Sequence, residues 1–192
     1  MTDYASLSAV KAALGSAETT DDSLLAALIT QASRAIDRHC AGFMDSDDYF
    51  VRETVTDEVL PALVSADGKL YCWPRKPKVE SVSALSYRFD PRETWQSVTA
   101  AYAVVDGYAV SADVSERRGK AQVKISYIGG FNTLPDDLVN AAVLLAVRFY
   151  KEIKSGLTDS IGVAELGTLQ YTKALPARVA EMLRSYKRMV VV

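Results

Sequence analysis

The hydrophobic pattern of this chain changes its period twice. Near both ends, apolar side chains recur at the three-and-four spacing of amphipathic helices, whereas the middle is rich in β-branched and aromatic residues and punctuated by turn signals. One stretch of chain cannot satisfy both periods, so helices and strands must occupy separate segments. We therefore expect an α+β protein: a helical bundle of about four helices, built from residues 1–47 and 129–192, with an antiparallel β-rich insertion at residues 48–128.

Capping residues predict where the helices begin and end. Ser6 is a good N-cap, and Gly15 is a typical residue just beyond a helix C-terminus. Acidic residues favour the first turn of a helix, and Asp136 with Asp137 stand after Pro135 in this way. The four helices are expected at residues 6–14, 21–41, 136–154 and 176–188.

Turn signals divide the middle of the chain into strands. Asp67-Gly68 and Asp106-Gly107 are typical of hairpin turns. Gly129-Gly130-Phe131 is expected to be a flexible exit whose position fits a hinge, and Ser155–Thr172 a long connection, which usually means function or disorder. Strands are expected at residues 49–55, 69–73, 79–89, 101–105, 108–110 and 122–128.

Charge and cysteine content limit the classes of function. The formal net charge is -2, which gives no overall attraction to nucleic acid or to an anionic membrane. The chain shows no signal peptide and no apolar run of membrane-spanning length, so we expect a cytosolic protein without a membrane partner. Cys40 and Cys72 are too few and too far apart for a disulfide framework or a zinc site, and we interpret them as buried thiols.

A search for catalytic chemistry finds no convincing set of residues. His39 and Cys40 are neighbours in a helix, so their side chains point about 100° apart. The acidic run Asp45, Asp47 and Asp48 lacks the calcium-loop pattern and reads as a solvated turn. Gly129-Gly130 lacks the spacing of phosphate-binding loops. We therefore expect no enzyme activity, no bound metal and no cofactor.

Two basic clusters in the β-rich middle are candidates for docking. They fall at Arg75-Lys76-Lys78 and Arg117-Arg118-Lys120, and each is also explained by charged turns that keep hairpin tips soluble. A second hypothesis is a ligand- or protein-binding module that uses aromatic side chains of the middle, namely Tyr71, Trp73 and Trp95. The candidate docking residues are Trp73, Arg75, Lys76, Arg117 and Arg118.

The order of several segments resembles a known family. The quoted segments are Tyr4-Ala5-Ser6-Leu7 at the start, Ala32-Ser33-Arg34-Ala35-Ile36-Asp37 in the second helix, Ile125-Ser126-Tyr127-Ile128-Gly129-Gly130-Phe131 followed by Leu134-Pro135-Asp136-Asp137, and Leu175-Pro176 before the last helix. In this order the chain resembles the head-tail connector (adaptor) proteins of tailed phages, prophages and gene transfer agents. The resemblance covers the first 45 or so residues and the last 70 or so, and the long β-rich middle departs from it.

The resemblance implies a structural virion protein. Its members would form a ring of about a dozen copies below the portal protein, extend the DNA channel without reading sequence, and bind a tail-completion or stopper protein. The expected location is the head-tail interface of the virion, after assembly in the bacterial cytoplasm. The long connection and the tail would be arms that order on a partner, and the residues expected to make these contacts are Gly156, Gly162, Gly167, Tyr171, Met189, Val190, Val191 and Val192.

Overall fold

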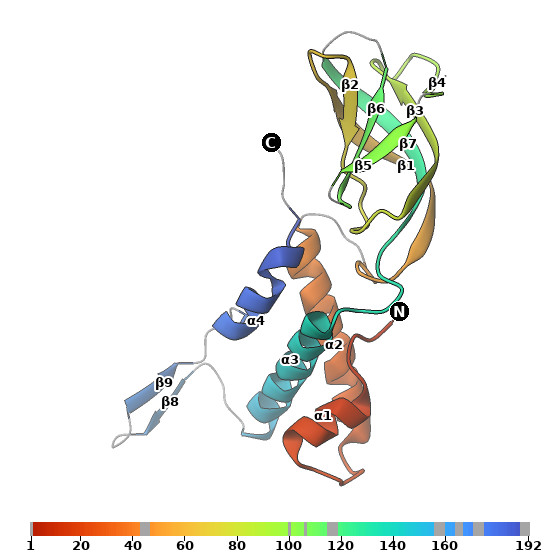
Figure 1. Ribbon diagram of the computed structural model, residues 1–192. Helices are drawn as coiled ribbons and strands as arrows, with labels where there is room; N and C mark the ends of the chain where they lie inside the picture. Colours follow the sequence, from red (N-terminus) through yellow and green to blue (C-terminus); the bar gives the residue numbers. More distant parts are fainter. Residues whose placement is uncertain are drawn as a thin grey trace. The chain divides into compact units, whose positions relative to one another are not determined.

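The structure is a computed structural model in which the chain divides into two compact units. One unit joins Met1–Asp48 to Leu134–Val192, and the other is Tyr49–Thr133. They are called the helical unit and the β unit here, and Figure 1 shows the elements of each. The structure describes residues 2–42, 47–99, 101–105, 107–114, 119–155, 160–163, 167–170 and 175–188.

The helical unit is organised around α3. This helix, Asp136–Lys154, packs against α1 (Leu7–Leu14), α2 (Asp22–Ala41) and α4 (Ala177–Leu183). Its buried face contains three alanines, which allow close approach of the neighbouring helices. A short 3-10 helix, η1 (Arg184–Tyr186), follows α4 directly. The buried residues of α3 are Leu138, Ala141, Ala142, Leu145 and Ala146.

The predicted helix limits are confirmed for the first three helices. The Oγ of Ser6 accepts a hydrogen bond from the N–H of Ala9 at 3.2 Å, so it caps α1. Gly15 ends α1 in the left-handed conformation, with φ of 67°. The fourth helix is shorter than expected, because regular α-helix ends at Leu183 and gives way to η1.

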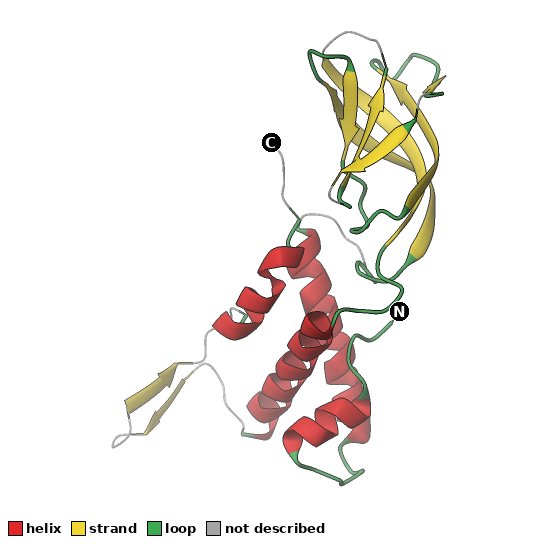
Figure 2. Cartoon of the chain, viewed as in Figure 1, coloured by secondary structure: helices red, strands yellow, loops and turns green. Residues whose placement is uncertain are grey.

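The expectation of a four-helix bundle as the main architecture is wrong. A seven-stranded antiparallel sheet is the largest element of the described chain, and the fold is mixed α+β. In the helical unit, α2 and α3 are long, with 20 and 19 residues, whereas α1 and α4 have 8 and 7. Helices of two turns cannot share the long apolar seam that holds a bundle together. The unit is therefore a pair of long helices with short helices attached, as Figure 2 shows in red.

A small hairpin occupies part of the predicted long connection, Ser155–Thr172. Strands β8 (Ser160–Val163) and β9 (Gly167–Gln170) pair with each other in antiparallel register. Gly162 lies within β8, and Gly167 begins β9. The other six residues expected to make arm contacts fall outside the described residues: Gly156, Tyr171, Met189, Val190, Val191 and Val192.

The β unit is a single antiparallel sheet that curls around its own core (Figure 1). The strand order is β4-β3-β7-β1-β2-β6-β5, so the two longest strands, β1 and β7, pair in the centre. The strands are β1 (Glu53–Val64), β2 (Lys69–Cys72), β3 (Ser81–Arg88), β4 (Gln96–Ser97), β5 (Tyr102–Val105), β6 (Ala109–Asp113) and β7 (Gly119–Gly129).

Alternation along the strands places one face of the sheet in the core. Leu60 in β1 lies opposite Val123 in β7, and both are buried. Residues on the other face, the outer face, are exposed or half-buried. The buried set across the sheet is Leu60, Ala62, Val64, Leu70, Cys72, Leu85, Tyr87, Val110, Ala112, Ala121, Val123, Ile125 and Tyr127.

None of the helices in the described ranges combines the length and the hydropathy that crossing a bilayer requires.

Candidate interaction surfaces

The chain enters and leaves the β unit at one junction. The N–H of Phe131 donates to the carbonyl of Phe50 at 2.7 Å, and the N–H of Arg52 donates to the carbonyl of Phe131 at 3.2 Å. The rings of Phe50 and Phe131 lie 6.2 Å apart, and the ammonium of Lys78 lies 4.8 Å from the centroid of the Phe131 ring. The incoming and outgoing segments are therefore held together by backbone bonds and by ring contacts.

The Gly-Gly pair, which the sequence suggested as a flexible exit, is a closely packed part of this junction. Gly130 has φ of 95°, and its N–H donates to the carbonyl of Pro77 at 2.6 Å. A Cβ built on Gly130 would lie 2.4 Å from the carbonyl oxygen of Val51, and one on Gly129 would lie 2.9 Å from the Cβ of Lys76. Both positions therefore need glycine, because no side chain fits there.

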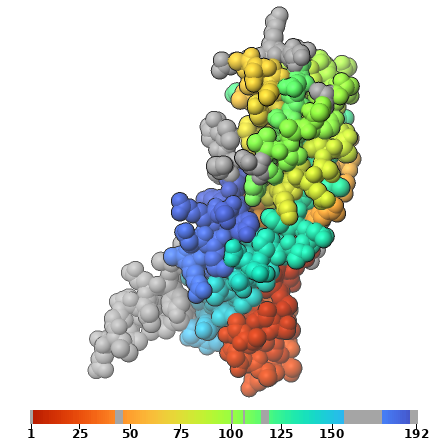
Figure 3. Space-filling model, viewed as in Figure 1, coloured from red at the N-terminus to blue at the C-terminus, as the bar shows by residue number. Residues whose placement is uncertain are grey.

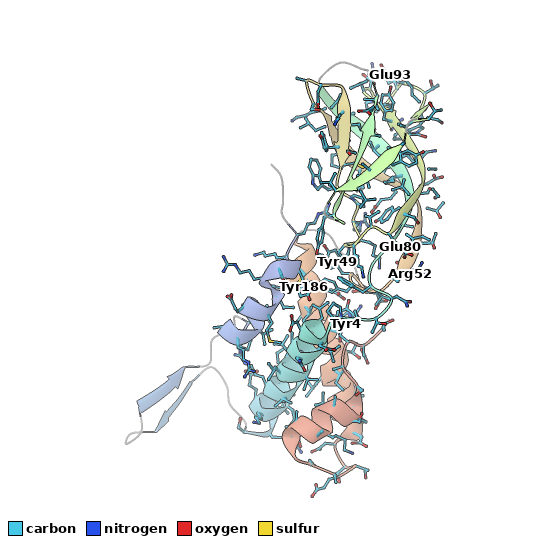
Figure 4. The ribbon with its side chains drawn as sticks, in the orientation of Figure 1. Tyr4, Tyr49, Arg52, Glu80, Glu93 and Tyr186 are labelled. Carbon is cyan, nitrogen blue, oxygen red and sulfur yellow. The ribbon has the colours of Figure 1, made fainter. Side chains whose placement is uncertain are left out.

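The segment after β2 contains three of the predicted docking residues in different environments. Trp73 is half-buried, Arg75 is exposed, and Lys76 is only 5% exposed. The ammonium of Lys76 lies 2.9 Å from a carboxylate oxygen of Glu53 and donates to the carbonyl of Val51 at 3.4 Å. Lys76 thus fixes this segment to the beginning of β1. Figure 4 labels a second ion pair of the same junction, Arg52–Glu80, whose atoms lie 2.8 Å apart.

Glu58 connects Arg75 to the core of the sheet. Its carboxylate accepts hydrogen bonds from the hydroxyl of Tyr127 at 2.9 Å and from the N–H of Arg75 at 3.2 Å, and it pairs with the Arg75 guanidinium at 3.1 Å. Burial raises the pKa of Tyr127, and the neighbouring Glu58 carboxylate acts in the same direction. The tyrosine therefore stays protonated and donates its proton to Glu58.

The outer face of the sheet has an apolar strip with cations beside it. Val59 and Leu63 in β1 are 51% and 45% exposed. They lie opposite Lys124 and Lys120 of β7, respectively. Of the second predicted basic cluster, Lys120 is described on this face, whereas Arg117 and Arg118 fall outside the described residues.

Two of the aromatic residues of the hypothetical binding module, Tyr71 and Trp95, lie on separate parts of the sheet. Trp95 packs against two cations: the guanidinium carbon of Arg88 is 4.3 Å from its ring centroid and the ammonium of Lys124 is 5.6 Å away. Tyr71 lies on β2, which is separated from β3 by β7 and β1 in the strand order. Three strand spacings amount to about 14 Å along the sheet, so Tyr71 and the strand that precedes Trp95 are not neighbours in it.

A polar network in the helical unit fixes the beginning of the chain to α2. The N–H of Tyr4 donates to Ser33 at 3.0 Å, and its hydroxyl donates to the carboxylate of Asp37. Arg34 lies 3.2 Å from Asp37 and 3.2 Å from Asp48. Tyr4, Ser33 and Asp37 are all buried, and Figure 4 labels Tyr4 beside these helices. In the sequence, these residues stand out only because they belong to segments that resemble a known family. Nothing in their pattern predicts that they form one network.

Asp48 makes the contribution of this network to the stability of the fold depend on pH. Burial alone would raise the pKa of Asp48, but hydrogen bonds from the Thr2 N–H and from Arg34 outweigh it, so the pKa lies below its usual value. A lowered folded-state pKa means that Asp48 stabilises the fold above the unfolded value of about 3.9. This contribution is lost as the pH falls through the lower, folded-state pKa.

We expect Asp48→Asn to weaken the fold at pH 7 and to reduce the difference in stability between pH 7 and pH 3. Urea unfolding followed by circular dichroism at both pH values measures this difference. Glu18→Gln, at an exposed position before α2, is the control and should leave both values unchanged. An unchanged pH dependence in Asp48→Asn would show that other carboxylates carry it.

The groups considered for catalysis lie in ordinary structural environments. Cys40 and Cys72 are buried, and burial raises the pKa of each thiol to about 12, so neither forms a thiolate near neutral pH. Partial burial, with the charge of Lys187, lowers the pKa of His39. Asp45 of the acidic run falls outside the described residues. Within the described ranges, no three His, Cys, Asp or Glu side chains are grouped to hold a metal ion.

A search of curated protein sequences found no match. Among solved structures, a chain of "Neck of empty GTA particle computed with C6 symmetry" matches with TM-score 0.50 and 18% identity, covering 97% of this chain and 90% of that one. A chain of "Virion of native gene transfer agent (GTA) particle" matches with TM-score 0.50 and 19% identity over the same shares. The family model of head completion proteins matches residues 4–189, and the chain therefore belongs to the head completion protein family.

Proposed function

We propose that this protein is a head-tail adaptor that forms a ring below the portal protein and extends the DNA channel toward the tail. The observation that carries the proposal is the family match over residues 4–189, which spans both units and supports a structural role where head and tail join. The similar neck structure computed with C6 symmetry supports a ring whose copy number is six or twelve. We propose a ring of about twelve, located in the virion after assembly in the bacterial cytoplasm.

The charge of the chain supports the role of a DNA conduit. A strongly basic wall would retain a passing duplex, because each lysine or arginine bound to phosphate releases counterions. The net charge of -2 avoids this retention. The protein would therefore guide DNA without recognising its sequence, and it would need neither cofactor nor enzymatic activity.

The partners divide between the two ends of the ring. We propose that the portal protein is bound at one end and a tail-completion or stopper protein at the other. The candidate docking residues on the β unit are the half-buried Trp73 and the exposed Arg75, together with Arg117 and Arg118. The candidate arms are the hairpin of β8 and β9, which includes Gly162 and Gly167, together with Gly156, Tyr171 and the segment Met189–Val192.

The proposal is tested by mixing the purified protein with the portal protein of the same virus or particle. We expect a complex larger than the portal ring, visible by negative-stain electron microscopy and mass photometry. Double substitution of Trp73 and Arg75 by alanine is expected to weaken binding of one partner at least tenfold, and circular dichroism verifies that the subunit stays folded without the Arg75–Glu58 pair. A protein that remains monomeric at high concentration and binds no portal would overturn the proposal.

The alternative of an aromatic ligand-binding module gains no support from the geometry. It requires Tyr71, Trp73 and Trp95 to line one concave site, whereas the strand order separates Tyr71 from Trp95. The ring of Trp95 is already in contact with Arg88 and Lys124.

A further inference from the structure

The two edges of the seven-stranded sheet differ in how they are protected. At one end of the strand order β4 has only 2 residues, which offers little for another chain to pair with. At the other end is β5, which pairs with β6 along all four of its residues and is terminal in the order of the described strands. Figure 3 shows this unit as a space-filling model, coloured from orange at β1 through yellow and green to teal at β7.

Strand β5 lacks the features that normally prevent edge pairing. Val104 and Val105 are 39% and 40% exposed. Residues 98–105 contain no charged residue and no proline. Natural edge strands are usually interrupted by lysine, proline or a bulge, because an uncharged β-branched edge is a template for an additional strand. The edge of β5 is therefore an uncharged surface to which another extended segment can pair.

We propose that β5 of one subunit is covered by the segment Met189–Val192 of a second copy, added as an antiparallel strand. This inference rests on the proposed ring and specifies one of its subunit contacts. The segment has four residues, as β5 has, and it is uncharged with three consecutive valines, which favour extended strands. It follows Arg188, whose N–H donates to the carbonyl of Cys40 at 2.9 Å, so it starts from a fixed point at the end of α2.

The symmetry of a ring favours this occupant over a second β5. Pairing of β5 with β5 would be two-fold symmetric, and it would close a dimer and leave no edge for further copies. Pairing of β5 with Met189–Val192 joins two different surfaces. Each copy then offers one edge and one strand, so the contact repeats around a closed ring.

Substitution at the exposed edge tests the contact. We expect Val105→Lys to lower self-association at least tenfold, because an edge lysine opposes pairing with an apolar strand. Thr56→Lys is the matched control: it introduces the same charge at an exposed β-branched residue of the central strand β1, away from the edge, and should leave association unchanged. Deleting Met189–Val192 should have the same effect as Val105→Lys. Analytical ultracentrifugation measures association, and circular dichroism verifies the fold of each variant.

Cross-linking identifies the occupant directly. A Val105→Cys protein is mixed with a Val191→Cys protein and treated with a short bismaleimide, which tolerates a slip in strand register. The native thiols are buried and do not compete. We expect a covalent dimer in this mixture, and none when Glu18→Cys, at an exposed turn, replaces Val105→Cys.

The outcomes separate this inference from the proposed function. If rings form but Val105→Lys and the deletion leave them intact, the inference is overturned and the adaptor role stands. The inference is also overturned if cross-linking occurs only when both cysteines are in one chain, since the segment then covers its own subunit. If the unmodified protein neither associates nor binds the portal, the proposed function itself fails.

Discussion

Gly130→Ala is expected to lower the stability of the β unit by about 3–5 kcal/mol, which is enough to unfold many small domains. The alanine methyl would lie 2.4 Å from the carbonyl oxygen of Val51 and 2.8 Å from the Cα of Arg52. Both are backbone atoms, so no side-chain rotation relieves the clash. The positive φ of 95° adds strain for any residue with a Cβ. The substitution should also weaken the backbone bonds that close the junction.

Two other glycines of the same unit separate the steric effect from the conformational one. Gly107 has φ of 70°, but its Cβ would have only an ordinary contact of 3.6 Å, so Gly107→Ala should cost about 1–2 kcal/mol. Gly119 has open space and no positive φ, and Gly119→Ala should be nearly neutral. Urea unfolding of the three variants gives the ranking. A loss for Gly130→Ala no greater than that for Gly107→Ala would contradict a packed junction.

Asp37→Ala is expected to destabilise the helical unit by about 3–5 kcal/mol. The Asp37 side chain is 2% exposed, and it accepts hydrogen bonds from the Tyr4 hydroxyl and from the N–H of Asp48 at 3.2 Å. Its removal leaves the guanidinium of Arg34, itself 13% exposed, without its closest buried counter-charge. Thermal and urea unfolding measure the loss.

Asp47→Ala is the matched control for this prediction. Asp47 lies 3.8 Å from the same guanidinium, but its side chain is 57% exposed. Exposed ion pairs contribute little, so this variant should lose less than about 1 kcal/mol. Equal losses for the two variants would mean that the network is stabilised by general charge balance and not by the buried contacts of Asp37.

Local signals predicted the helical part of the fold well. A cap such as Ser6 and a stop such as Gly15 act within one turn, so their effect can be derived from neighbouring residues. The prediction of a helical bundle was wrong because the lengths of the individual helices do not show how many of their residues pack together in one core. That property depends on distant parts of the chain, and the short α1 and α4 cannot supply it.

The central strand β1 was predicted only in part, for two reasons. Pro61 usually argues against an interior strand, yet it lies where pairing with β2 has not begun, since that pairing covers Ala62–Val64. A register shift between Val55 and Glu58 breaks the alternation, with Asp57 at a positive φ of 52°. A bulge of this kind shifts the inward face by one residue, so the period-two pattern disappears from the sequence.

The candidate surfaces show the same limit of sequence reasoning. A run such as Arg75-Lys76-Lys78 predicts an exposed basic patch, because nothing in the run reveals a buried counter-ion. Glu53 pairs with Lys76 from another strand, and Glu58 pairs with Arg75 in the same manner. Gly129-Gly130 was likewise predicted to be flexible, although glycine is also needed where two backbone segments come into close contact.

The closed junction of the β unit has a consequence for the entropy of the whole chain. The backbone bonds between Phe50, Arg52 and Phe131 hold the two ends of the insertion at the spacing of neighbouring strands. The helical unit therefore closes a gap of about 5 Å between these ends, whatever the number of residues beyond them. The conformational entropy that the chain loses when the helical unit brings these two ends together is then that of closing a short loop. Lineages could lengthen, shorten or exchange the β unit without a matching loss of stability in the helices.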